Sequence, residues 1–193
     1  SICLLSNGEI IKLRNAFADL HIHIGRANGR PIKITASRSL TLASLLEDVA
    51  SRKGLDIIGV VDAGTAPVLA EIEQMVEKGV LRTHHRGGFI APHGVMLLTG
   101  CEVETQEGVH VIVYLPHLDS LYKYQKYMRS RVKNQELSTQ RCQASMLELI
   151  NLAHLLEGVF CPAHAFTPHK GFYGMLSPSF RSYLGKEVDH IRA

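Results

Sequence analysis

The chain has 193 residues, 46% of them hydrophobic and 20% charged, with 21 lysines and arginines against 18 aspartates and glutamates. These proportions exclude an intrinsically disordered, collagen-like or disulfide-dense protein, and a formal net charge of +3 is too small to argue for nucleic acid as a partner. No apolar run approaches the roughly 20 residues of a membrane span, and no secretory leader is recognisable, so we expect no membrane partner. The four cysteines lack C-x-x-C spacing, which favours reduced thiols and a cytoplasmic location over a disulfide framework.

The first fifteen residues are expected to form an arm that precedes a single larger domain. Within this arm (1–15), apolar segments at 2–5 and 9–13 flank an Asn-Gly pair, which is typical of a hairpin turn. The remaining residues, 16–193, contain no internal repeat, low-complexity run or linker rich in Pro, Gly and Ser. We therefore predict one domain over 16–193, long enough to enclose a substantial core.

Strand-like and helix-like segments alternate along this domain. The predicted strands cover residues 17–24, 55–62, 94–103, 109–115 and 159–165. The predicted helices cover residues 41–53, 67–78, 118–131, 139–156 and 177–184, and a further strand begins near residue 186. This alternation with short links predicts an α/β fold with a parallel sheet or barrel. Because a complete eight-stranded barrel takes about 250 residues, we expect an incomplete barrel that forms the N-terminal portion of a longer protein.

The first strand of this domain carries a His-x-His pair. Residues two apart project from the same face of a strand, so His21 and His23 can reach one metal ion or two neighbouring ones. The opposite face, with Leu20, Ile22 and Ile24, is apolar and suited to packing on helices. The pattern therefore predicts a polar site on one side of this strand and core on the other.

Metal-ligating residue types also stand at the ends of the later predicted strands. They are Asp62, Glu102, His110 and His164. In parallel α/β folds, binding sites are assembled from residues at the carboxyl ends of the strands, so we expect these side chains to meet His21 and His23.

A mixed set of imidazoles and carboxylates favours zinc, manganese or iron over an ion that prefers oxygen ligands alone. Carboxylates such as Asp62 and Glu102, to which we assign catalytic roles, can bridge two cations that imidazoles alone would not neutralise. Two metals about 3.5–4 Å apart suit the hydrolysis of a phosphate ester, because one activates water and both stabilise the oxygens in line.

Four basic residues lie in the loop that follows the His-x-His strand. They are Arg26, Arg30, Lys33 and Arg38. This loop must lie at the same end of the sheet as the metal ligands, so its cations are candidates for binding a substrate phosphate. A solvated loop with no such role is the alternative.

Residues 18–23, with their strand ending in His-x-His, resemble the first motif of the PHP (polymerase and histidinol phosphatase) superfamily. Residues 98–103, 109–112 and 162–168 are similar to one branch of it, endonuclease Q, a DNA-repair nuclease. The Pro-Ala-His-x-x-Thr-Pro stretch at 162–168 is the most specific of these motifs. The chain departs from the usual PHP pattern after Asp62, where no histidine follows.

The resemblance implies a distorted (β/α)7 barrel that holds two or three divalent metal ions, zinc ahead of manganese or magnesium. It implies that the metal ligands are His21, His23, Glu102, His110 and His164. The expected activity is cleavage of DNA on the 5′ side of deaminated bases or abasic sites, and the enzyme must hold the damaged nucleotide out of the stack.

Two other functions remain open from the sequence. The same metal site can serve a small-molecule phosphatase or an amidohydrolase. Alternatively, a truncated barrel without activity can act as a DNA-binding or scaffolding piece, in which case binding falls steeply with salt and needs no metal.

Overall fold

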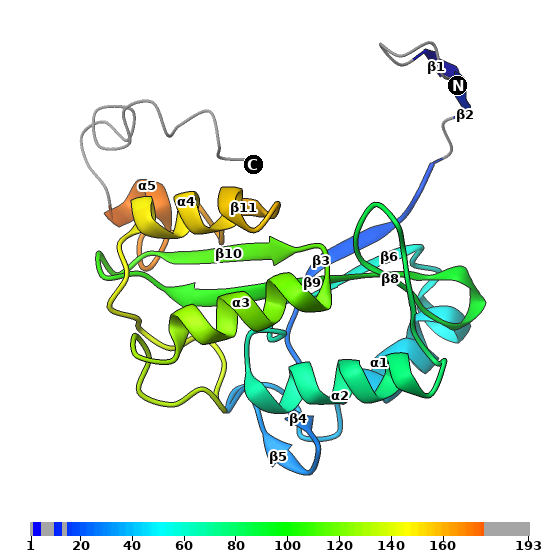
Figure 1. Ribbon diagram of the computed structural model, residues 1–193, viewed down its shortest axis with the longest axis horizontal. Helices are drawn as coiled ribbons and strands as arrows, with labels where there is room; N and C mark the ends of the chain where they lie inside the picture. The colour runs from blue at the N-terminus through cyan, green and yellow to red at the C-terminus, as the bar shows by residue number, and fades with distance from the viewer. Residues whose placement is uncertain (1, 5–9, 13–14, 176–193) are drawn as a thin grey trace.

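The computed structural model describes residues 2–4, 10–12 and 15–175 (Figure 1). Its strands are β1 Ile2–Leu4, β2 Ile10–Lys12, β3 Ala18–Ile22, β4 Arg26–Ala27, β5 Arg30–Pro31, β6 Ile57–Val60, β7 Arg82–Thr83, β8 Phe89–Ile90, β9 Met96–Glu104, β10 His110–Leu115 and β11 Val159–Pro162. Its α-helices are α1 Leu42–Asp48, α2 Ala66–Glu77, α3 Leu118–Met128, α4 Met146–Leu155 and α5 Phe172–Met175. A π-helical turn at Val49–Lys53 continues α1, and a 3₁₀ turn at Pro92–Gly94 precedes β9.

The central sheet is mixed, with the strand order β11-β10-β9-β6-β3. Strands β3, β6 and β9 run parallel, whereas β10 is antiparallel to both β9 and β11. The prediction of a wholly parallel sheet is therefore wrong at β10. Only residues 105–109 separate β9 from β10, and a parallel connection needs a crossover of about a dozen residues or more. In the described part of the chain the sheet is open, with β3 and β11 at its edges, and the closed barrel stays a prediction.

The sheet curls so that its inner face brings distant strands together. Tyr114 on β10 reaches across the two intervening strands, and its hydroxyl donates a hydrogen bond to the carbonyl of Leu20 on β3. Glycines make this approach possible, because a Cβ at Gly100 would lie 2.9 Å from the Tyr114 ring and a Cβ at Gly59 would lie 2.4 Å from the Leu20 carbonyl oxygen. Larger side chains at these two positions would hold the strands apart.

Alternation along β10 separates two hydrophobic clusters. Val111, Val113 and Leu115 belong to the large core that packs against α1, α2, α3 and α4, whereas Ile112 and Tyr114 contact a small cluster on the inner face. Residues of one parity share a face of a strand, so the first residue of β10, a histidine, lies on the inner face as well.

Helix boundaries follow the expected signals at the first two helices. Thr41 caps α1 through the amide of Ser44, and Gly54 ends the helical segment with φ of +60°. Pro67 lies in the first turn of α2, as predicted. None of the described helices has the length and apolar character needed to cross a membrane.

The fourth predicted helix begins later than expected. Residues 139–145 are not helical, and α4 starts at Met146, where Ser145 forms a capping box with Glu148. Short hairpins that were not predicted occur at β4–β5 and β7–β8. The two segments predicted to flank a turn in the arm do pair antiparallel, as β1 and β2, whereas the predicted Asn-Gly turn lies outside the described residues. The helix predicted over 177–184 and the strand after 186 lie outside the described residues.

We expect Gly59→Ala to lower the free energy of unfolding by about 1–3 kcal/mol, because the new methyl group would press on the backbone of β3. Denaturant unfolding followed by circular dichroism measures this. Gly79→Asn is the matched control, since nothing lies within 4 Å of its Cβ position and asparagine tolerates its φ of +71°. Equal losses in the two variants would contradict the close approach of β3 and β6.

Candidate metal centre

The sheet brings the predicted histidines and Glu102 together at one end of its strands, the end at which β3, β9 and β11 finish. His21 and His23 lie at the carboxyl end of β3, and His164 follows the carboxyl end of β11. His110 begins β10, but because β10 is antiparallel its amino end lies beside the carboxyl end of β9, where His110 pairs with Glu104. Because β10 is reversed, His110 therefore lies at the same end of the sheet as His21, His23 and His164.

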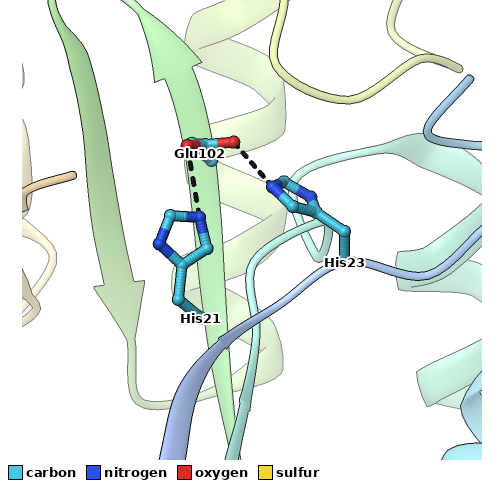
Figure 2. A group of neighbouring side chains, drawn as sticks. All are labelled: His21, His23 and Glu102. Atoms are coloured by element: carbon cyan, nitrogen blue, oxygen red, sulfur yellow. Dashed lines mark ion pairs between the residues drawn. The ribbon is translucent and has the colours of Figure 1, made fainter. Parts of the chain in front are cut away.

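Two groups of side chains share Glu102. Within each group, the atoms that could bind a metal all lie within 4.8 Å of one another. In the first group, Glu102 Oε1 lies 3.3 Å from His21 Nε2 and Glu102 Oε2 lies 2.9 Å from His23 Nε2 (Figure 2). In the second group, His110 Nδ1 lies 3.7 Å from Glu102 Oε1 and 3.0 Å from His164 Nε2. One carboxylate thus stands between two histidine pairs and belongs to both groups.

Asp62 lies behind His23 and belongs to neither group. Its Oδ1 is 2.7 Å from His23 Nδ1 and also accepts a hydrogen bond from Ser138, while its Oδ2 accepts one from the amide of Ile24 at 2.7 Å. With these partners Asp62 is 1% exposed. It holds the His23 ring so that Nε2 faces Glu102, a supporting position and not the ligand position that its strand end suggested.

The other two ring nitrogens of the second group also face polar side chains. His110 Nε2 lies 3.6 Å from Glu104 Oε2, and His164 Nδ1 lies 3.0 Å from the hydroxyl oxygen of Thr167. Glu104 is in turn 2.6 Å from Lys170 Nζ. Partners of this kind fix ring orientation and tautomer at metal-binding histidines. Sequence reasoning did not single out these partners, although Thr167 belongs to the Thr-Pro part of the most specific motif.

The connection between α3 and α4 crosses the site. The hydroxyl of Thr139 donates to Glu102 Oε2 at 2.7 Å, next to the contact of Ser138 with Asp62. Thr139 is β-branched and has φ of +53°, and His164 has φ of +33°; such conformations are strained and cluster at functional sites. Sequence reasoning missed Ser138 and Thr139 because the predicted helix over 139–156 began at Thr139, and Ser and Thr are common at the start of a helix.

Of the four basic residues in the first loop, Lys33 is the one that the structure brings to Glu102. Its Nζ lies 3.6 Å from Glu102 Oε2 and donates a hydrogen bond to the Thr139 hydroxyl. Arg30 instead pairs with Glu136 at the surface. The other two, Arg26 and Arg38, are exposed.

Protonation at the site is dominated by the buried carboxylates. Burial alone would raise the pKa of Glu102, but hydrogen bonds from His21, His23 and Thr139 lower it well below its usual range. Burial alone would lower the pKa of His23, but its hydrogen bonds to Asp62 and Glu102 raise it to about 9. Without a metal, the His23 cation therefore offsets the carboxylates, and a divalent cation can take over that role.

The donor set fits a divalent metal. Imidazole nitrogens and carboxylate oxygens at close range are ligands that zinc and manganese accept, and the outer nitrogens of His23 and His164 are already hydrogen-bonded. Burial, together with the charge of His164 and Lys33, lowers the pKa of His110 despite the opposing effect of Glu102, which favours the neutral imidazole that binds metal.

Comparison with known proteins shows which fold this is. In the crystal structure of the lesion-specific endonuclease PfuEndoQ from Pyrococcus furiosus, 39% of the chain superposes on 88% of this one, with a TM-score of 0.72 and 23% identity. The chain has an endonuclease Q-like fold. A complex of endonuclease Q with a duplex that carries an abasic lesion at the active site gives a TM-score of 0.71 and 24% identity, over 88% of this chain and 40% of that one.

Among curated proteins, the uncharacterized protein YqxK of Bacillus subtilis strain 168 is 36% identical over 168 residues, which cover 84% of this chain and 43% of YqxK. No protein-family model matches the chain. The chain therefore spans about two fifths of the length of YqxK and of the endonuclease Q structures. The resemblance to endonuclease Q inferred from the motifs is confirmed at the level of the fold.

We expect the wild-type chain to bind two equivalents of zinc, and Glu102→Ala to lose both, because both groups use this carboxylate. The double variant His21→Ala/His23→Ala should lose one equivalent. Elemental analysis by mass spectrometry after dialysis measures the metal content per chain. His85→Ala, at an exposed histidine, is the control and should keep both equivalents. Retention of both equivalents in Glu102→Ala would rule out a shared ligand.

Zinc affinity should rise with pH up to about 9, because His23 must lose a proton before it binds metal and its pKa is about 9 without one. Below pH 9 each further unit should tighten binding by up to about tenfold for one released proton, and above it the dependence should flatten. Competition with a chelating dye over pH 6.5–9.5 measures this. Affinity that is constant from pH 7 upward would contradict the raised pKa.

Proposed function

We propose that this chain carries the metal-dependent active site of an endonuclease that acts on damaged DNA. The observation that carries the proposal is the placement of Glu102 between two histidine pairs at one edge of the sheet. The fold of the chain, shared with a lesion-specific endonuclease, supports the choice of a nuclease over other metal-dependent hydrolases.

Two divalent cations, zinc ahead of manganese or magnesium, would activate water and offset the charge that develops on the phosphate oxygens. His21, His23 and Glu102 would hold one of them, and Glu102, His110 and His164 the other. Asp62 acts through His23, whose ring it fixes, and is a positioning residue in this proposal.

Lys33 is the residue of the first loop that we assign to substrate phosphate. Its ammonium group lies at the edge of the carboxylate cluster, and about a fifth of its side chain (20%) is exposed. The hydrogen bond to Thr139 restrains it, so its charge is fixed next to the place where a phosphate would meet the metals.

An open cavity of about 720 Å³ adjoins this lysine and supports DNA as the partner. It lies between the loop at 32–35 and the connection at 130–143, and Ser138 and Thr139 form part of its wall. Besides Lys33, its lining includes Arg131, Lys133 and Arg141 but no aspartate or glutamate. A cavity of this charge favours a polyanion.

The substrate we propose is duplex DNA with an abasic site or a deaminated base, cleaved on the 5′ side of the lesion. A related structure holds a duplex with an abasic lesion at its active site, which supports the first of these. A lesion that is weakly paired is easier to remove from the stack, which gives a physical basis for selectivity.

Zinc- or manganese-loaded chain should nick a duplex that contains an abasic site, deoxyuridine or deoxyinosine, and leave an undamaged duplex intact. We expect Glu102→Ala to remove the activity, and Asp62→Asn to lower it by about 10–100-fold through the loss of support for His23. Denaturing gels of end-labelled strands locate the cut and measure its rate.

Asp119→Asn, at an exposed helix residue, is the matched control for Asp62→Asn and should cleave as the wild type does. A folded, metal-loaded chain that leaves every lesion duplex intact would contradict the proposal. If that chain hydrolyses a small phosphomonoester instead, the phosphatase alternative takes its place.

A further inference from the structure

Two exposed aromatic rings are stacked beside the second histidine pair. Phe166 is 85% exposed and Tyr173 is 50% exposed. Their ring centroids are 4.9 Å apart and their planes differ by only 6°. Phe166 follows His164 by two residues, so the stack of Phe166 and Tyr173 lies at the border of the candidate metal centre.

The stack is anchored in the hydrophobic core. The ring of Tyr173 meets that of Phe172 edge-on, with centroids 5.3 Å apart and an angle of 85°. Phe172 is 2% exposed and belongs to the main core. The amide of Tyr173 also donates to the carbonyl of Ala165 at 2.8 Å. A buried ring therefore supports Tyr173, and Tyr173 supports Phe166, whose other face is open to solvent.

Close backbone contact fixes the turn that carries these rings. A Cβ at Gly171 would lie 2.5 Å from the Thr167 carbonyl oxygen, and a Cβ at Gly174 would lie 2.4 Å from the same atom. The amide of His110 donates to the carbonyl of Lys170 at 2.8 Å. The same turn thus holds His110 and His164 and presents the aromatic stack, which ties the position of the stack to the metal centre.

A flat ring with an open face is suited to a flat partner. Unpaired nucleobases are recognised by stacking on such side chains, and base–aromatic stacking tolerates any base because every base has a π-face. A protein partner would favour a wider apolar surface than one supported ring. Next to a centre proposed to bind a phosphodiester, the occupant with the matching chemistry is a base of the same strand.

We propose that Phe166, supported by Tyr173, is a stacking platform for an unpaired nucleobase adjacent to the scissile phosphate. This inference rests on the proposed nuclease function and adds a base-binding site to it. The platform takes an unstacked base of any sequence, and Tyr173 acts on it through Phe166.

Binding in the presence of EDTA separates the platform from cleavage. A single-stranded oligonucleotide with 2-aminopurine at one position should lose fluorescence when it binds the wild-type chain, because stacking quenches this base. Phe166→Ala should abolish the quench and weaken binding by about fivefold or more. Tyr173→Phe keeps the supporting ring and should quench as the wild type does. Leu155→Ala, at an apolar residue that is 77% exposed on α4, is the matched control.

The chain contains no tryptophan, so Phe166→Trp places a single fluorophore at the platform. Its emission should fall when an oligothymidine is added and should not change with an oligonucleotide of the same length built only from abasic residues. The abasic strand keeps the phosphates and lacks the bases, so this comparison separates stacking from charge.

An undiminished 2-aminopurine quench in Phe166→Ala, or an equal response of Phe166→Trp to the two strands, would overturn the platform. Thermal unfolding of each variant shows that the comparison is made on folded protein. If the base-dependent quench is seen but lesion duplexes are not cleaved, the proposed function fails while the base-binding site stands. If cleavage is seen without the quench, the nuclease stands and the platform fails.

Discussion

The buried carboxylate of Glu102 is the group around which the candidate site is organised. A carboxylate removed from water is unstable unless donors or positive charge surround it. His21 and His23 supply them from β3 and the residue after it, Thr139 from the connection before α4, and Lys33 from the first loop. The need to satisfy one buried charge therefore ties together segments that are distant in the sequence. Divalent cations would meet the same need, which is why the site fits them.

The direction of β10 decides whether Glu102 faces one histidine pair or two. His110 lies beside the carboxyl end of β9 because the short link at 105–109 forces an antiparallel pair. In a parallel strand the first residue would lie at the opposite edge of the sheet, away from Glu102. The curl of the sheet adds to this, since Tyr114 can reach Leu20 only across two glycines. Backbone topology and small residues thus create the second histidine pair.

A supporting layer holds the groups that face Glu102. Asp62 fixes His23, Glu104 faces His110, and Thr167 fixes His164. The turn at 164–175 also presents the aromatic stack that we propose as a base-binding platform. Because one turn serves both purposes, metal binding and base stacking are expected to depend on the same backbone contacts, and a change that loosens the turn would affect both.

Local patterns in the sequence determined strands β3, β6, β9, β10 and β11 of the central sheet, the start of α1 at Thr41, and the histidines and Glu102 that meet where β9 ends. Alternation and capping depend on residues close in the chain, so they can be read without the fold. Only the tertiary structure decided the supporting position of Asp62 and the contacts of Ser138 and Thr139 with the two carboxylates. Periodicity shows which residues of an element share a face, but it holds no information about which distant side chain will meet that face: Leu20 on β3, predicted to face the core, is 44% exposed.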